Sequence, residues 1–472
     1  MARIAFVTSA YTSILNANFE LARLLQAAGH QVTYASPHPI DGAVAANGLV
    51  FQKLSNPIVA RGYAYAGLEP NGPSFAEPSG KLARMQRKLT GWLAKCPTVR
   101  QRRRAAIQTL ELAQICQELS ELSPDLLLVD IELAEYIIAA RSLAMPLALT
   151  STWVSVWKRP GLPPLHDTAL PDAAQVGNRL GLEWRWWRFR WQQWSQRQQQ
   201  RLRTVGCDRV SILERYAKDV GVAFWEEIDL YQWLLPCSYR SIPILSLNAY
   251  EFDFPHDPPP HAHYLGPTIG LHREDPSSDR AVRQQLEDIV ARHRSNPESQ
   301  ALLYCVFGTF SGSYDLALLE RIIEAIARNP QWTLILSLGG QRDPNGMKQL
   351  PSNVWVFQRV PQLFVLEQAD AAIVHAGIAT IAECIHFGVP MLVYSVEVTD
   401  QNGNAARVAY HDLGIRGDRQ SDDAAAIQLY LHDLLASEAV RDSLHRMQEY
   451  FRRYAIENTA VKTVESLLAD RQ

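Results

Sequence analysis

The hydrophobic positions near the start of the chain predict an alternation of strands and helices. Apolar runs at Ile4–Val7 and Gln31–Ala35 have the length of buried strands. Between them, Asn18–Ala28 places its apolar residues on one face of a helix. Two later runs, Asp125–Val129 and Leu147–Thr150, predict further strands of the same sheet. A strand, a helix and a second strand in this order form a βαβ unit, so we expect a parallel sheet covered by helices.

A stretch rich in proline and histidine, FPHDPPPHAHYLGP at 254–267, interrupts this periodicity, and we interpret it as a linker. A second alternation of strands and helices follows. Its predicted elements are a helix at 316–327 and strands at 302–306, 332–336, 354–357, 371–374 and 391–394. The sequence therefore predicts an α/β protein with two doubly wound, Rossmann-like domains that face each other across a cleft. In such sheets ligands bind at the carboxyl ends of the strands.

The length of 472 residues also favours two domains, because a single hydrophobic core stops growing at about 250–300 residues. We place the first domain at 1–245 and the second at 246–450. An amphipathic helix at 451–472 is expected to return to the first domain.

Composition and charge narrow the function classes. The net charge of −3 provides no overall basis for binding nucleic acid. Six scattered cysteines without a Cys-x-x-Cys pair are poor material for a disulfide framework or a zinc site. The apolar run at the amino terminus is too short for a signal peptide, and no apolar run has the length of a membrane span. We therefore expect a cytoplasmic protein, with peripheral contact to the inner face of a membrane left open.

Residues suited to a phosphate follow the predicted strand at 371–374. His375 ends this strand, Gly377 permits close backbone approach, and a helix begins soon afterwards. The free N–H groups of a helix amino terminus, together with the hydroxyl of Thr380, form a site that attracts an anion. Glu383 lies one turn further on, where a carboxylate would repel a phosphate but could accept hydrogen bonds from the paired hydroxyls of a ribose.

A second polar cluster follows the apolar run at 389–396. Asp400 and Gln401 offer acceptors and a donor that suit adjacent hydroxyls, as on a hexose. Phosphate, ribose and sugar sites in this order indicate a nucleotide sugar.

The order of these residues resembles the donor-binding segment of the UDP-dependent family-1 glycosyltransferases, in their bacterial form. That segment reads His-x-Gly-x-x-Ser/Thr-x-x-Glu, then Gly-Val-Pro, then Asp-Gln-x-x-Asn-Ala. The corresponding sequences here are HAGIATIAE, GVP and DQNGNA, at 375–383, 388–390 and 400–405. Further matches are YLGP, VFGT and RVPQ, at 264–267, 306–309 and 359–362. The resemblance implies the GT-B fold.

The resemblance also implies roles for individual residues. His375 and Thr380 would contact the diphosphate, Glu383 the ribose, and Asp400 with Gln401 the sugar. The backbone of Val360 would bind the base, and Arg359 stands where the family often has a tryptophan that stacks on uracil. A guanidinium plane can also stack on a base. The full expected donor site is Thr309, Arg359, Val360, Gln362, His375, Gly377, Thr380, Glu383, Asp400 and Gln401.

The implied activity is transfer of a sugar, which we expect to be a hexose, from a UDP-sugar to a hydroxyl group, with inversion. The acceptor is expected to be a hydrophobic small molecule or lipid-like, and no metal or other cofactor is expected. The alternative is a catalytically silent nucleotide-sugar-binding or membrane-associated scaffold protein of the same fold.

The catalytic base of the family is absent from its usual position. In the family a histidine near the amino terminus accepts the acceptor proton and is held by an aspartate. Counting back from Gly29-His30 places Ile14 at the histidine position, whereas Asp130 retains the place of the aspartate. Three interpretations stay open. Asp130 or Glu132 acts as the base with a raised pKa, the loop residue His166 substitutes, or the protein needs no such base or only binds.

Two basic stretches stand apart from the donor motif. The segment 183–203, EWRWWRFRWQQWSQRQQQRLR, places four tryptophans on one face of a helix, with arginines beside them. The segment 81–104 is also rich in lysine and arginine. The helix would either pack over the acceptor cleft or lie on a membrane surface. Nucleic acid is not expected as a partner.

Overall fold

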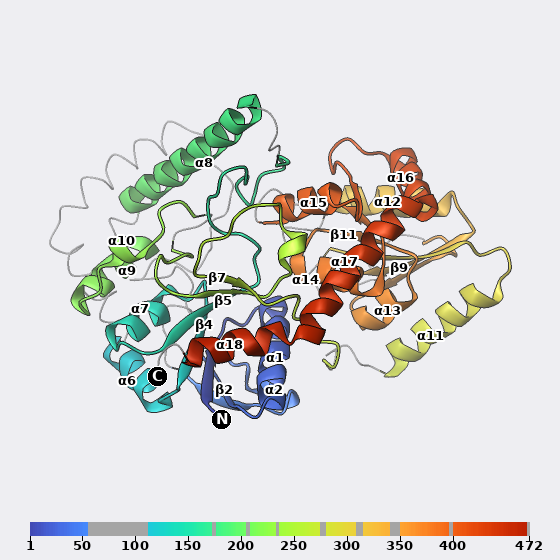
Figure 1. Ribbon diagram of the computed structural model, residues 1–472. Coiled ribbons are helices and arrows are strands. Elements are labelled where there is room, and N and C mark those ends of the chain that lie inside the picture. Colours follow the sequence, from blue (N-terminus) through green and yellow to red (C-terminus); the bar gives the residue numbers. More distant parts are fainter. Residues whose placement is uncertain are drawn as a thin grey trace.

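The computed structural model describes residues 1–54, 112–171, 176–203, 208–232, 236–273, 280–307, 315–339, 350–395 and 400–469. Within these stretches the chain forms two α/β domains side by side, each built around one parallel sheet (Figure 1).

The described part of the first domain contains a seven-stranded sheet in the order β3-β2-β1-β4-β5-β6-β7. All of its strand pairs are parallel. The strands β4 and β5, with the sequences LLLVD and LALTS, are buried along their whole length, as expected for a sheet covered on both faces. The strands are β1 (Arg3–Val7), β2 (Gln31–Ser36), β3 (Val50–Lys53), β4 (Leu126–Asp130), β5 (Leu147–Ser151), β6 (Ile244–Ser246) and β7 (Ala262–Tyr264).

Helices cover both faces of this sheet because successive strand residues point to opposite sides. Ile4 and Phe6 of β1 belong to a core that includes α1 and α18. Ala5 and Val7 belong to a core that includes α6, α7 and α9. The helices before the second domain are α1 (Thr12–Ala27), α2 (Asp41–Ala46), α6 (Leu112–Leu122), α7 (Ala134–Ser142), α8 (Val176–Arg203), α9 (Arg209–Asp219) and α10 (Phe224–Glu227).

The described part of the second domain has a six-stranded parallel sheet in the order β10-β9-β8-β11-β12-β13. Its strands are β8 (Ala301–Val306), β9 (Trp332–Ser337), β10 (Val354–Phe357), β11 (Ala371–Val374), β12 (Met391–Val393) and β13 (Gly414–Arg416). Its helices, and those that follow, are α11 (Arg280–Ser295), α12 (Leu316–Ala327), α13 (Gln362–Gln368), α14 (Ile378–Phe387), α15 (Gln401–Tyr410), α16 (Ala424–Ala436), α17 (Glu438–Glu457) and α18 (Thr459–Ala469).

Several predicted boundaries differ from the structure. The helix α1 begins six residues before the predicted start at 18, because its first turns mix buried apolar residues with polar ones and lack a clear period. The first sheet continues to Tyr264, past the predicted boundary at 245 and into the stretch interpreted as a linker. Its last strand, β7, has only three half-buried residues, too few to show an apolar period.

The end of the chain returns to the first domain. The helix α17 packs on α14 of the second domain, and α18 packs on α1 of the first (Figure 1). Asn458 joins the two helices in a left-handed conformation, with φ at 53°. The predicted start of a returning helix at 451 therefore lies inside α17. Among the described helices, none combines the length and apolar composition needed to cross a bilayer.

A buried ion pair fixes α15 of the second domain to the first domain. Arg407, which is 1% exposed, donates to Oδ1 of Asp253 from Nε at 2.8 Å and from Nη2 at 2.6 Å. Its Nη2 also donates to Oγ of Ser155 at 3.2 Å, and its guanidinium lies over the ring of Phe254. The other oxygen of Asp253 accepts from the N–H of Ser155 at 3.1 Å and the hydroxyl of Tyr264 at 2.9 Å.

These contacts decide the charge state of the pair. Burial acts to raise the pKa of Asp253, but the charges of Arg407 and His256, together with the hydrogen bonds from Arg407 and Tyr264, outweigh it and hold that pKa below its ordinary value. Asp253 is therefore an ionised carboxylate in the interior, and each of its oxygens accepts hydrogen bonds.

We predict that Arg407→Met destabilises the protein strongly, because it leaves the Asp253 carboxylate buried without its cation. The expected loss in the free energy of unfolding is about 3–5 kcal/mol, measured by chemical denaturation. The control is Arg328→Met, which removes an exposed ion pair with Glu324 and should cost about 1 kcal/mol or less. Equal losses for the two variants would show that the buried pair has no special role.

Candidate functional site

The turn between β11 and α14 holds the first cluster of predicted donor residues. His375 follows β11, and Ala376 adopts a left-handed conformation with φ at 65°, which costs a non-glycine residue about 1–2 kcal/mol. This turn brings the imidazole against Gly377, where an added Cβ would lie 2.7 Å from Nε2 of His375. Gly377 is therefore needed for the placement of the ring. The side chain of Asn404 donates to the carbonyl of Ala376 at 3.1 Å and secures the turn from α15.

The chemistry of this turn suits an anion. Gly377 caps α14 and offers no side chain to the first N–H groups of that helix. Burial lowers the pKa of His375 to about 4, so the imidazole is neutral at neutral pH. The ring can thus contribute a hydrogen bond but not a positive charge. Any attraction for a phosphate here comes from the helix terminus and from neutral donors.

Thr380, Glu383 and Gln362 form a connected polar network beside the turn. The amide of Gln362 donates to Glu383 at 2.6 Å and to the hydroxyl of Thr380 at 3.4 Å. Tyr304 of β8 donates to the carbonyl oxygen of the same amide at 3.2 Å. Arg273, which lies between the two sheets in the chain, forms an ion pair with the other oxygen of Glu383. A ribose that bound Glu383 would have to replace this arginine.

Asp400 and Gln401 lie at the start of α15, beyond the end of β12. Asp400 accepts from the side chain of Asn404 at 2.7 Å, so one asparagine connects this carboxylate to the turn at Ala376. Asn404 belongs to the DQNGNA motif but was not among the predicted site residues. The signal that could have identified it is its spacing of four residues from Asp400, which places both on one helix face.

The remaining predicted donor residues differ in their exposure to solvent, and one of them is not described. Val360 is buried, and Arg359 beside it, at the end of β10, is exposed. Thr309 lies outside the described residues.

Of the two carboxylates proposed as bases, Asp130 ends β4 of the first domain and Glu132 lies two residues beyond it. Asp130 is 2% exposed, and its two oxygens accept from the backbone N–H groups of Ser9 at 3.3 Å and Glu132 at 3.1 Å. Burial raises the pKa of Asp130. Burial also raises the pKa of Glu132 to about 8, assisted by the charge of Asp130 and, from the second domain, that of Asp400. Glu132 is therefore a carboxyl group that exchanges its proton near neutral pH.

The third candidate, His166, lies on a loop and stacks on Phe189 of α8, with ring centroids 4.3 Å apart. Burial lowers its pKa below the ordinary value. This loop contacts the second domain directly. An added Cβ on Gly403 would lie 1.8 Å from the carbonyl oxygen of Leu165, so only glycine fits there. Ile14, at the family's histidine position, is a buried residue of α1.

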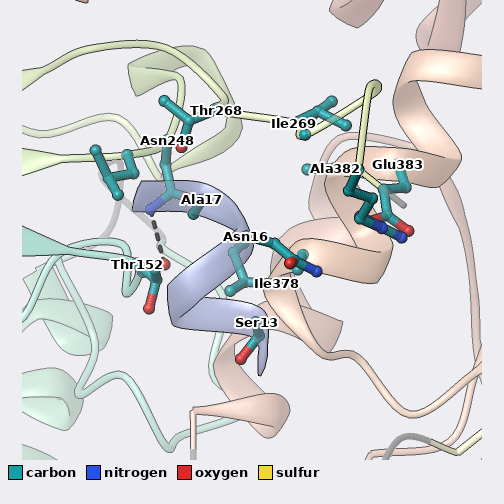
Figure 2. A pocket seen from close by; sticks show the side chains of 14 residues that line it. Ser13, Asn16, Ala17, Thr152, Asn248, Thr268, Ile269, Ile378, Ala382 and Glu383 are labelled. Atoms are coloured by element: carbon teal, nitrogen blue, oxygen red, sulfur yellow. Dashed lines mark hydrogen bonds and ion pairs between the residues drawn. The ribbon is translucent and has the colours of Figure 1, made fainter. Parts of the chain in front are cut away.

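Two cavities lie between the domains. Figure 2 shows the smaller one, where Ser13 and Asn16 of α1 face Ile378 and Glu383 of α14; its volume is about 30 Å³, close to that of one water molecule. The larger is a groove of about 1210 Å³. His166 lines this groove, together with residues of α8 and of the second-domain loops after β12 and β13.

Comparisons with known proteins agree on a glycosyltransferase-like chain. The family model "Erythromycin biosynthesis protein CIII-like, C-terminal domain" matches residues 325–462. The NDP-glycosyltransferase YjiC of Bacillus subtilis is 27% identical over 39% of this chain and 43% of its own length. Demethyllactenocin mycarosyltransferase of Streptomyces fradiae is 31% identical over 31% of this chain and 32% of its own length. The chain thus spans less than half the length of these relatives.

Other similarities cover the whole chain at lower identity. Zeaxanthin glucosyltransferase of Pantoea ananas is 21% identical over 100% of this chain and 97% of its own length. The solved glycotransferase of kitacinnamycin matches with a TM-score of 0.67 and 21% identity, covering 99% of this chain and 98% of its own. The glycosyltransferase VinC, solved with dTDP, matches with a TM-score of 0.58 and 17% identity over 100% of both chains. These structures establish the GT-B fold for the chain.

We predict that Glu132 makes the stability of the protein fall as pH rises. Its folded pKa of about 8 lies above the ordinary value of about 4.3, so between these values the unfolded chain loses a proton that the folded protein keeps. The stabilisation is complete below about pH 4 and is lost as pH rises through about 8. Glu132→Gln should therefore gain thermal stability relative to wild type between about pH 5 and 8. The exposed control Glu324→Gln should show no such trend, and a flat difference for Glu132→Gln would contradict the prediction.

Proposed function

We propose that the protein transfers a hexose from a UDP-sugar to a hydroxyl group of a hydrophobic acceptor, with inversion at the anomeric carbon. The observation that carries the proposal is the assembly of His375, Glu383 and Asp400 around the start of α14, in a GT-B fold with glycosyltransferase relatives. Asn404 connects Asp400 to the turn beside His375, and Gln362 connects Glu383 to Thr380, so hydrogen bonds hold both parts of the cluster in place without a ligand.

In this proposal the donor lies against the second domain. Its diphosphate takes hydrogen bonds from the open N–H groups of α14 and from the imidazole of His375. The ribose hydroxyls take the place of Arg273 and donate hydrogen bonds to Glu383. Asp400 accepts hydrogen bonds from the hydroxyls of the sugar, and the side-chain amide of Gln401 donates one to them. No metal takes part, because helix N–H groups and neutral donors meet the phosphate charge.

The reaction then needs one base, and Glu132 fits it better than Asp130. Both oxygens of Asp130 already accept hydrogen bonds from backbone N–H groups. Glu132 instead has a pKa of about 8, to which the negative charge of Asp400 contributes. The acceptor oxygen forms a bond to the anomeric carbon as its proton passes to Glu132. The bond from the anomeric carbon to the diphosphate oxygen breaks, and UDP leaves. Asp130 positions Glu132 through its backbone N–H.

The relatives inform both substrates. VinC was solved with dTDP, so UDP and dTDP are the two nucleotides whose binding distinguishes the donors. One relative that aligns over the whole chain is named zeaxanthin glucosyltransferase. This name and the groove of about 1210 Å³ support a bulky hydrophobic acceptor.

We predict that Glu383→Ala weakens UDP binding, measured by calorimetry, by roughly tenfold or more, because hydrogen bonds to a charged group contribute about 1.5–3 kcal/mol. Arg273→Ala should bind UDP at least as tightly as wild type, since it removes the competing cation. The exposed control Glu324→Ala should be unchanged. Equal affinity in Glu383→Ala and wild type would remove the ribose assignment. Tighter binding of dTDP than of UDP would indicate a dTDP-sugar as the donor instead of a UDP-sugar.

We predict that Glu132→Gln lowers turnover by about 10²–10⁴-fold, the usual contribution of general-base catalysis, while leaving UDP affinity intact. In the wild type, turnover should rise with pH towards about 8, because the carboxyl must lose its proton to act. The assay is UDP release from UDP-glucose with an apolar extract as acceptor. If Glu132→Gln and Asp130→Asn keep full turnover and His166→Ala abolishes it, the loop histidine is the base. UDP binding without turnover for any donor would indicate a silent binding protein.

A further inference from the structure

The helix α8 buries one face and exposes a row of tryptophans on the other. Leu182, Trp186 and Phe189 are 9% exposed or less, and Trp186 donates to the carbonyl of Leu162. The tryptophan stripe, which consists of Trp184, Trp187, Trp191 and Trp194, is 54–62% exposed. The buried face of this helix packs on the loop at Leu162, and whether it covers an acceptor stays a prediction. The stripe is exposed to solvent, and α8 runs along the outer edge of the first domain (Figure 1).

The charged residues of α8 are almost all positive. The helix carries seven arginines and a single glutamate. Its glutamate pairs with Lys158, and Arg185 and Arg197 pair with Asp167 and Glu214 of neighbouring segments. The other arginines include Arg188, Arg201 and Arg203, which are exposed. A partner for the stripe must therefore accept both aromatic rings and positive charge.

We infer that the tryptophan stripe and its arginines dock the protein on an anionic lipid surface. Tryptophan favours the boundary between headgroups and acyl chains, where its ring is buried and its N–H stays near polar groups. Arginines beside such a ring meet the negative headgroups. An amphipathic helix with this composition lies in the plane of the interface and does not span the membrane.

Two other partners fit less well. A second copy docked through the same helix would place the arginines of one α8 against those of the other, since a twofold contact joins like surfaces. Single-stranded nucleic acid needs free aromatic faces on which bases stack. Here the rings of Trp187 and Trp191 stack on each other, at an angle of 13° and with ring centroids 6.1 Å apart. The ring of Trp194 lies 5.2 Å from that of Trp191, so the tryptophans face one another and leave fewer faces for bases.

The stripe also connects to the groove between the domains. Trp184 belongs to the stripe and lines the groove of about 1210 Å³, together with Arg188 and Phe189. The docked surface therefore reaches the mouth of the groove. Resting on the proposed function, this would let an apolar acceptor pass from the bilayer into the cleft without crossing water.

The test is co-sedimentation of the full chain with vesicles of phosphatidylcholine alone or with added phosphatidylglycerol. We expect binding to the anionic vesicles and weakening by salt. The double variant Trp187→Ser/Trp191→Ser should lose about tenfold or more in partitioning. Its matched control is Leu429→Ser/Ile456→Ser, which removes two exposed apolar residues from other helices and should bind as wild type.

A second pair of variants tests the charge. Arg201→Gln/Arg203→Gln should lose about fivefold for each arginine, and the exposed control Arg452→Gln/Lys462→Gln should not. Equal partitioning of the tryptophan variant and wild type would overturn the inference. A loss of partitioning in either control variant as large as that in the variant it matches would do the same. A dimer that dissociates in the tryptophan variant without vesicle binding, or binding of oligothymidylate in place of vesicles, would also overturn it. None of these readouts depends on transferase activity.

Discussion

The ion pair between Arg407 and Asp253 is the constraint on which the cleft depends. It lies in the interior and joins α15 of the second domain to a loop of the first. The same helix begins with the sugar-site candidates Asp400 and Gln401, and its Gly403 admits the backbone of Leu165 at a distance no other residue allows. Any rotation of one domain against the other must therefore break a buried charge pair or separate a tight backbone contact. The position of Asp400 and Gln401 relative to the loop at Leu165 is therefore fixed by α15.

A second constraint lies in the turn from β11 into α14. Ala376 accepts an unfavourable conformation there, and the contacts of its carbonyl with Asn404 and of His375 with Gly377 hold it in place. The consequence is electrostatic. The imidazole is packed so tightly that it stays neutral, so the anion site depends on oriented N–H groups and not on a cation. Such a site needs no reorganisation when a charged ligand arrives.

The sequence predicted the sheets well because their central strands are continuous apolar runs, such as LLLVD, whose burial depends little on context. It could not place β7, whose three residues are defined only by pairing with β6. The candidate donor residues could be selected from the sequence because their order along one βαβ unit brings them to one edge of the sheet, and their roles stay predictions. Arg273 could not be found, since its contact with Glu383 joins positions 110 residues apart with no motif between them. For the same reason the pKa of Glu132 needed the structure, because Asp400 acts on it from the other domain.

The loss of the usual histidine at position 14 has a physical counterpart elsewhere in the first domain. Ile14 is buried in α1, and its aliphatic side chain cannot accept a proton. Asp130, which would have held the histidine in the family, instead binds two backbone N–H groups and places Glu132 beyond the end of β4. Burial and the charge of its neighbour then bring the pKa of Glu132 into the range where an imidazole would act. The pKa of a carboxyl group at this point of the fold is thus set by burial and by charges from both domains, and not by its residue type alone.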